Sequence, residues 1–242
     1  MNGSEAMVKT LLAGAVDICF ANPGTSEMHF VSALDRAPGM RCVLGLFEGV
    51  VSGAADGYYR MAEKPAATLL HLGPGLGNAL ANIHNAKRAN SGMVNIVGQH
   101  ALDHIHNNAP LNSDVEAVAR PMSHWVKTTM SASQAPLDTA EAVSQARSTP
   151  GRIATLVLPA NCAASAASCS SIPATSRSRR AVTGSTSVTR LTVFKFNFTS
   201  ALIANSLAVL AKAVTPHTVI VGQKQKLHVF RSPAQPPVSS VS

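Results

Sequence analysis

The sequence predicts an α/β fold, a parallel sheet covered by helices on both faces, followed by a low-complexity basic tail. Short runs that are apolar at every position recur along the first 160 residues, and stretches of helical periodicity separate them. Runs that are apolar on both faces are typical of strands buried in a parallel sheet. Short connections between alternating strands and helices indicate the same architecture, because parallel neighbours must be joined by a crossover.

The expected elements follow one another in a regular order. Strands are expected at 17–21, 41–47, 66–72, 93–98, 124–129 and 152–160, and helices at 4–13, 27–36, 48–61, 76–89, 114–119 and 136–147. Ligands of parallel sheets bind beyond the carboxyl ends of the strands. Three distinctive segments stand there: NPGTSE after the first strand, FEG after the second and HLGPGLGN after the third.

Charge separates the tail from the rest of the chain. All twelve acidic residues lie at or before Glu141, whereas eleven of the 20 Lys and Arg residues follow it. Since about a quarter of an average domain is charged with both signs, a hundred residues without a carboxylate are unusual. We therefore predict a domain over 1–160 and a Ser/Thr/Arg-rich linker over 161–200, whose composition is typical of disorder.

Several functional classes are disfavoured by the composition. No apolar stretch is long enough to cross a bilayer, and charged residues interrupt any early secretory signal, so we expect a cytoplasmic protein. The four cysteines show no metal-binding spacing and are expected to be free, buried thiols. Arg177, Arg179 and Arg180 lack interleaved aromatic residues, so no nucleic-acid partner is expected.

Two weaker motifs each have a structural explanation beside the functional one. The glycines of HLGPGLGN suggest a dinucleotide fingerprint, but the pattern starting at Gly73 requires glycine where the chain has Asn78. The alternative is a tight turn whose glycines take positive φ. His100, His104 and His106 near Asp103 are metal-ligand types, although solvated histidines of a loop explain them better, and no metal site is predicted.

Glu48 is the most unusual carboxylate of the chain. Leu46 and Phe47 precede it and Gly49 and Val50 follow, and a carboxylate buried among apolar side chains is unfavourable unless it is paired. A functional acid is one interpretation. The other is a first-turn acid that the helix dipole stabilises.

Together, ANPGTSE, FEGVVSGAADGYYRMAEKPAATLLHLGPGLGNALANIHNAKRA and VNIVG resemble the N-terminal pyrimidine-binding domain of thiamine diphosphate (TPP) enzymes. The resemblance covers about 1–160 and is nearest to acetolactate synthases and benzoylformate decarboxylase-like proteins. It implies that Glu48 activates the cofactor through its aminopyrimidine, and that the substrate is a small 2-oxo acid. Only the pyrimidine half of thiamine diphosphate is expected to meet this domain.

The resemblance also implies roles for the residues around Glu48. The cofactor-binding residues would be Pro23, Gly24, Glu48, Gly73, Gly75 and Asn78. Thr25 or Ser26 would hydrogen-bond the substrate carboxylate, or else would only cap the following helix. His71 would be a catalytic proton shuttle, with a structural histidine as the alternative.

Departures from the family limit the prediction. The chain has APLNSD at 109–114 where acetolactate synthases carry Phe-Gln-Glu, which argues against acetolactate synthesis itself. The Gly-Asp-Gly motif that holds Mg²⁺ in the family does not occur in the 242 residues. Mg²⁺ is therefore expected from a missing domain, and the flavin FAD, found in part of the family, leaves no readable signal.

Because of these departures, the chain resembles a truncated member of the family. Residues 201–242 are a possible remnant of the family's central domain. The expected partner is a second copy of the chain or the diphosphate-binding domain of another chain, and the chain alone is predicted to be inactive. The alternative function is a non-catalytic isolated α/β domain or partner-binding fragment.

Overall fold

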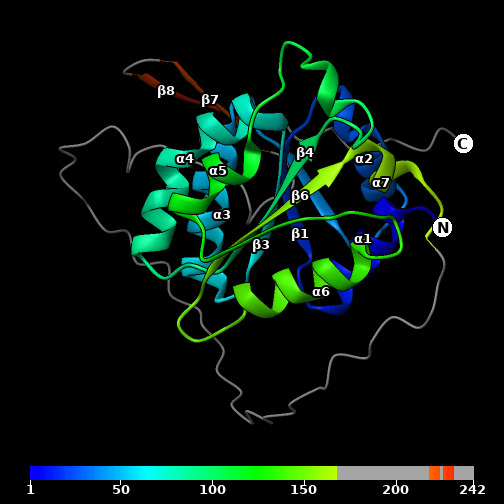
Figure 1. Ribbon diagram of the computed structural model, residues 1–242. Helices are drawn as coiled ribbons and strands as arrows, with labels where there is room; N and C mark the ends of the chain where they lie inside the picture. The colour runs from blue at the N-terminus through cyan, green and yellow to red at the C-terminus, as the bar shows by residue number, and fades with distance from the viewer. Residues whose placement is uncertain (168–217, 224–225, 232–242) are drawn as a thin grey trace, which may run out of the picture.

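A six-stranded, all-parallel sheet forms the centre of the protein, in the order β2-β1-β3-β4-β6-β5 (Figure 1). The computed structural model describes residues 1–167, 218–223 and 226–231. The strands are β1 (Ile18–Asn22), β2 (Arg41–Leu44), β3 (Ala66–Leu70), β4 (Met93–Gln99), β5 (Trp125–Thr128) and β6 (Ile153–Pro159). All six expected strands are present, and the α/β architecture with a parallel sheet is confirmed.

Helices cover both faces of this sheet (Figure 1). They are α1 (Gly3–Ala13), α2 (Met28–Asp35), α3 (Glu48–Ala62), α4 (Leu72–Arg88), α5 (Val115–Ala119), α6 (Ala135–Ala146) and α7 (Ala160–Ala164), with 3₁₀ turns η1 (Thr25–Glu27), η2 (Ile105–Asn107) and η3 (Arg120–Met122). Apolar side chains of α3, α4 and α5 pack on one face, and those of α1, α2, α6 and α7 pack on the other. Each face therefore has its own core.

Two boundaries differ from the sequence prediction. β2 ends at Leu44, not at 47, because it is an edge strand and the side chains of Leu44, Leu46 and Phe47 are exposed. α4 begins at Leu72, four residues earlier than expected, although its first turn contains glycine and proline. Burial of Leu72 and Leu76 outweighs the low helix propensity of that turn, and proline is tolerated in a first turn because its missing N–H would have no partner there.

The ADGYYR segment of α3 has a structural role. Asp56 is buried and accepts two hydrogen bonds from Arg60, one turn later, and a third of 2.6 Å from the hydroxyl of Ser91. Arg60 itself is exposed. The carboxylate thus ties α3 to the turn before β4 with its charge fully paired.

A chain of buried polar side chains crosses the central strands. Thr68 donates to Asn95, Asn95 donates to Thr155, and Thr155 lies 2.7 Å from the hydroxyl of Ser123. All four residues are buried, and they lie on the α3–α4 side of the sheet. Because a one-residue slip would leave these groups unpaired, the chain favours one register of β3, β4 and β6.

His124 makes the stability of the domain depend on pH. Its Nδ1 accepts a hydrogen bond of 3.0 Å from the backbone N–H of Ile153, a role that the protonated ring cannot fill. Burial lowers the pKa of His124, and the charges of Lys87 and Arg152 lower it further. Because the pKa of His124 is lower in the folded state, its contribution to stability is fully present above the unfolded-state pKa of about 6.5. That contribution is lost as the pH falls through the folded-state pKa.

We therefore expect the free energy of unfolding to decline as the pH falls below about 6.5. His124→Gln keeps a side-chain acceptor but cannot titrate, so the free energy of unfolding of this variant should decline less. Urea denaturation at several pH values measures both curves. Parallel curves for the two proteins would contradict the role given to His124.

The described part of the chain continues past the expected domain boundary at 160. α7 follows β6 directly, Cys162 is buried, and the N–H groups of Gly3 and Ala167 bond to the carbonyls of Ser165 and Met1. The predicted linker from 168 to 200 lies outside the described residues. Within 201–242 the structure describes an antiparallel hairpin, β7 (Thr218–Gln223) and β8 (Lys226–Arg231).

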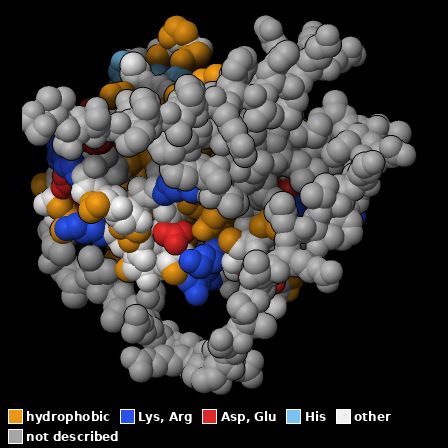
Figure 2. Space-filling view, turned by 180° about the vertical axis from the view of Figure 1, so that it is seen from behind, with side chains coloured by type: hydrophobic (Ala, Val, Ile, Leu, Met, Phe, Trp, Pro, Cys, Tyr) orange, Lys and Arg blue, Asp and Glu red, His pale blue; other side chains and the backbone are white. Residues whose placement is uncertain are grey.

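The surface and the cysteines complete the description. On the face shown in Figure 2, the described Lys and Arg side chains lie among acidic and apolar ones. No helix among the described residues is long and apolar enough to cross a membrane. Cys19 and Cys162 are free and buried, as expected, but Cys42 on the edge strand β2 is exposed, so that expectation was wrong for this residue.

Candidate functional site

The order of the strands predicts a ligand-binding position at the carboxyl ends of β1 and β3. The chain passes from β1 to β2 on one side and returns to β3 on the other, so the direction of winding reverses between β1 and β3. Such a reversal separates the following loops and leaves a crevice. The segment after β1 carries Pro23, Gly24, Thr25 and Ser26, and the residue after β3 is His71.

A buried carboxylate, Glu27, contacts His71 at this position. Its Oε2 lies 2.8 Å from Nδ1 of His71 and also accepts a hydrogen bond of 2.7 Å from the N–H of Gly24. The side chain of Glu27 is 1% exposed, and that of His71 is 23% exposed. The carboxylate therefore fixes the orientation of a ring whose other edge can still reach a ligand.

Two glycines make this pair possible. A Cβ on Gly24 would lie 2.3 Å from the imidazole of His71, and a Cβ on Gly98 would lie 1.5 Å from Oε1 of Glu27. Neither glycine has a positive φ. Their small size is what the site requires, so Gly24 lies beside His71 as a packing residue.

Glu48 lies at the beginning of α3, beyond the end of β2. Its Oε2 accepts a hydrogen bond of 3.0 Å from Nδ2 of Asn78 in α4, and its Oε1 would lie 3.2 Å from a Cβ on Gly75. Glu48 is half-buried, and Leu46 and Phe47 are exposed beside it. The structure thus brings together Glu48, Gly75 and Asn78, while Gly75 also lies against the Cβ of His71.

The glycines of HLGPGLGN do not serve as positive-φ turn residues, which corrects one of the two expectations for this segment. None of the described glycines has a positive φ; the residue that takes one here is Leu72, with φ 52°. A Cβ on Gly73 would lie 1.8 Å from Oγ of Ser113, whereas Gly77 has nothing within 4 Å. The three glycines therefore have three different environments.

This difference predicts opposite effects for two identical substitutions in α4. Gly77→Ala should raise the free energy of unfolding by about 0.5–1 kcal/mol, since alanine favours the helix and meets no neighbour. Gly73→Ala should lower it by about 1–2 kcal/mol, because the added carbon overlaps Ser113. Urea denaturation of both variants measures the difference, and effects of the same sign would contradict the packing described here.

The remaining expected site residues have weaker support. Thr25 is exposed and Ser26 half-buried, and neither side chain makes a hydrogen bond within the described part of the chain. The expectation that they cap the helix is wrong, because the carboxylate of Glu27 makes the cap by accepting from Gly24. Their hydroxyl groups thus make no hydrogen bond that the structure describes.

The loop histidines do not assemble into a metal site. The rings of His100 and His104 lie 5.8 Å apart, and His104 contacts the amide of Asn107. In residues 1–167 and the two tail strands, no group of three His, Cys, Asp or Glu side chains is placed to hold a metal ion.

Sequence reasoning missed Glu27. It was expected only as the first residue of a helix, and its partner His71 is 44 residues away. A signal exists in the sequence, since Glu27 directly follows two small hydroxyl residues in the segment after the buried strand β1. That signal is equally typical of an ordinary helix start.

Comparisons with known proteins show which proteins this chain is similar to. Residues 1–124 match the family described as "Thiamine pyrophosphate enzyme, N-terminal TPP binding domain". A Mycobacterium tuberculosis protein, "Putative acetolactate synthase large subunit IlvX", is 58% identical over 161 residues, which are 66% of this chain and 31% of that protein. Benzoylformate decarboxylase of Pseudomonas aeruginosa is 33% identical over 128 residues, 52% of this chain and 24% of the enzyme.

A solved structure shows the same fold. The thiamine diphosphate-dependent 4-hydroxybenzoylformate decarboxylase of Rhodococcus jostii RHA1 superposes with a TM-score of 0.66 at 28% sequence identity. The superposition covers 70% of this chain and 32% of the decarboxylase. The chain thus spans about a third, or less, of the length of the relatives it matches.

Proposed function

Because this chain belongs to the thiamine pyrophosphate enzymes and carries their N-terminal TPP-binding domain, we propose that it supplies the cofactor-activating half of a 2-oxo acid carboligase or decarboxylase. Thiamine diphosphate, when bound, supplies the electron sink for carbon–carbon bond chemistry. The observation that carries the proposal is the position of Glu48, beyond the end of β2 with one carboxylate oxygen fixed by Asn78. This geometry leaves the other oxygen, Oε1, to meet a ring nitrogen.

The residues around Glu48 fit the pyrimidine half of the cofactor. Gly75 has no side chain and lies against Oε1 of Glu48, so a flat ring can approach the carboxylate there. The exposed side chains of Leu46 and Phe47 offer apolar surface beside it. Glu48 would hold a proton between its Oε1 and the ring, and Asn78 would keep the carboxylate in place during that exchange.

His71 is the second proton-carrying group of the proposal. A carboxylate oxygen of Glu27 can only accept at Nδ1, so this nitrogen is the donor of the contact, and Nε2, which has no hydrogen-bond partner among the described residues, is left for the substrate side. Nε2 would then accept a proton from the substrate side or return one to it. Thr25 and Ser26, with unused hydroxyl groups, would bind the carboxylate of a small 2-oxo acid.

The diphosphate and Mg²⁺ need residues from elsewhere. No Gly-Asp-Gly motif occurs in the 242 residues, and the described residues contain no cluster of metal-ligand side chains. We propose that the diphosphate-binding domain of another chain covers the exposed apolar side chains of Leu44, Leu46 and Phe47 beside Glu48. The bound cofactor would lie between the two chains.

Calorimetry with Mg²⁺ and thiamine diphosphate tests the proposal in two proteins. The 242-residue chain alone should show no binding below millimolar concentration, because a pyrimidine ring and one hydrogen bond offer few contacts. A chimera in which residues 1–160 replace the matching part of the Mycobacterium tuberculosis relative should bind the cofactor at micromolar concentration. A folded chimera without binding would contradict the proposed function and would favour a non-catalytic α/β domain.

A further inference from the structure

Two cysteines lie directly opposite each other on neighbouring strands of the sheet. β1 and β2 run parallel, and Cys19 of β1 is the register partner of Cys42 of β2. Two backbone hydrogen bonds of 2.9 Å, donated to β1 by Arg41 and Gly45, lie on either side of the pair and hold this register. The fold therefore fixes which two thiols are neighbours, although 23 positions separate them in the sequence.

The two cysteine side chains point to the same side of the sheet. Cys19 belongs to the core under α1 and α2, and Val43, the residue after Cys42, packs on the opposite core, as alternation along a strand requires. Neighbouring strands lie about 4.7–4.9 Å apart, and the Cα atoms of a disulfide usually lie about 4.4–6.8 Å apart. The spacing of β1 and β2 therefore permits a disulfide between the two thiols.

The two thiols differ in their access to solvent. Cys19 is fully buried, whereas Cys42 is exposed on the edge strand β2, whose outer edge pairs with no other described strand. Burial raises the pKa of both thiols, and the neighbouring Cys42 raises the pKa of Cys19 further, as expected for two groups that lie close together. A dissolved reagent can thus reach Cys42 first, and Cys19 is the second thiol beside it.

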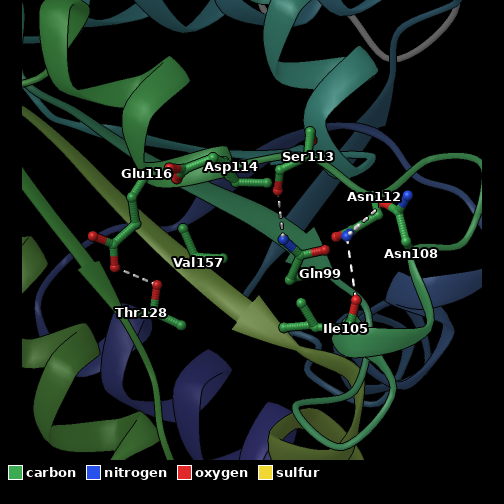
Figure 3. A pocket seen from close by; sticks show the side chains of 10 residues that line it. Gln99, Ile105, Asn108, Asn112, Ser113, Asp114, Glu116, Thr128 and Val157 are labelled. Atoms are coloured by element: carbon green, nitrogen blue, oxygen red, sulfur yellow. Dashed lines mark hydrogen bonds between the residues drawn. The ribbon is translucent and has the colours of Figure 1, made fainter.

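The two edge strands of the sheet are fastened in different ways. On β5, Lys127 bonds to Glu141 of α6, and Thr128 donates to Glu116 of α5 at the wall of the cavity that Figure 3 shows. The last three side chains of β2 are one thiol and two alkyl groups, which cannot make such bonds. A covalent bond at Cys42 would give β2 the side-chain fastening that β5 already has.

From this geometry we propose that Cys19 and Cys42 are a redox-sensitive pair, which forms a disulfide when the protein meets a small-molecule disulfide. The disulfide closes the loop of chain between the two cysteines, and this loop contains Gly24 and Glu27 of the candidate site. The oxidised protein therefore has a restrained edge strand and a restrained site segment. The inference goes beyond the proposed function and does not depend on it.

The thiol–disulfide exchange has two steps. The thiolate of Cys42 attacks one sulfur of the small disulfide, so a mixed disulfide forms and one small thiolate leaves. The thiolate of Cys19 then attacks the sulfur of Cys42, forms the new S–S bond and releases the second small thiolate. Two protein thiols thus lose two electrons and two protons, and the small disulfide becomes two thiols. The raised pKa values make both attacks slow near neutral pH, because little thiolate is present.

Oxidised glutathione tests the pair in the folded 242-residue chain. The experiment uses a Cys169→Ser background, because Cys169 lies outside the described residues. At about pH 8.5, where more thiolate is present, Cys19 and Cys42 should be lost together, and mass spectrometry should find one peptide pair joined through them. Cys162, also buried, is the internal control and should stay a free thiol. The linked protein should unfold at a urea concentration about 1 M higher, because the disulfide constrains the unfolded chain.

Two variants separate the steps of the exchange. Cys42→Ser should leave Cys19 unmodified, since the buried thiol cannot meet glutathione by itself, and Cys19→Ala should stop the reaction at a mixed disulfide on Cys42. Accumulation of that mixed disulfide while Cys19 is present, a disulfide between Cys42 of two chains, or no loss of either thiol would overturn the inference. An unchanged urea midpoint in the linked protein would overturn the restraint of β2.

Discussion

Glu48→Gln in the chimera should slow exchange of the thiazolium C2 proton of thiamine diphosphate by at least about 100-fold. Glutamine fills the same space and keeps a partner for Asn78, whose Nδ2 lies 3.0 Å from Oε2 of Glu48. It cannot hold the proton shared with the pyrimidine, so the loss should affect activation and leave cofactor binding nearly unchanged. Exchange into deuterated water, followed by proton NMR, gives the rate, and calorimetry gives the affinity.

Glu63→Gln is the matched control for that experiment. Glu63 follows the last turn of the same helix α3 and is exposed, so the same chemical change at this position should leave the exchange rate unchanged. If the thiazolium C2 proton exchanges at the same rate in the Glu48→Gln and Glu63→Gln variants, Glu48 is only a first-turn acid at the beginning of α3. The family resemblance would then stand without its mechanism.

Gly98→Ala should be among the most destabilising single-methyl changes in the domain. The new Cβ would lie 1.5 Å from Oε1 of Glu27, and Glu27 cannot move without breaking its bonds to Gly24 and His71. Overpacking together with the unpaired groups should lower the free energy of unfolding by about 2–4 kcal/mol. Urea denaturation of the 242-residue chain measures the change.

A double-mutant cycle shows whether Glu27 is responsible. If the methyl group acts by displacing this carboxylate, then Gly98→Ala added to Glu27→Ala should destabilise much less than it does in the native sequence. Simple additivity of the two changes would mean that the backbone of β4, and not Glu27, resists the methyl group. Gly77→Ala, in open space, shows what a glycine-to-alanine change does without a clash.

Local periodicity was enough to predict most of the fold. The strands and helices from 4 to 160 were recognisable because buried parallel strands are apolar at every position and helices repeat every 3.6 residues. The start of α3 at Glu48 was also predictable, since it follows directly from the end of an apolar run. These features depend on residues that are close in the sequence, so no knowledge of packing is needed.

The boundaries that failed depended on neighbours far along the chain. The residues Gly45, Leu46 and Phe47 were expected to continue the strand, but β2 has a neighbouring strand on one side only and its end is exposed. Gly73 and Pro74 read as loop, but burial of Leu72 and Leu76 makes this segment the first turn of α4. Tertiary packing outweighs propensity in both places.

The site residues also divide into those that the sequence alone identifies and those that only the folded structure identifies. Glu48 could be singled out from its own neighbours in the sequence, because a carboxylate among apolar residues needs a reason. The pair of Glu27 and His71 could not, because the two residues follow different strands and meet only when β1 and β3 lie side by side. Only the folded sheet decides which strand ends are neighbours, and so only it shows that Gly24 and Gly98 make room for one histidine and one carboxylate.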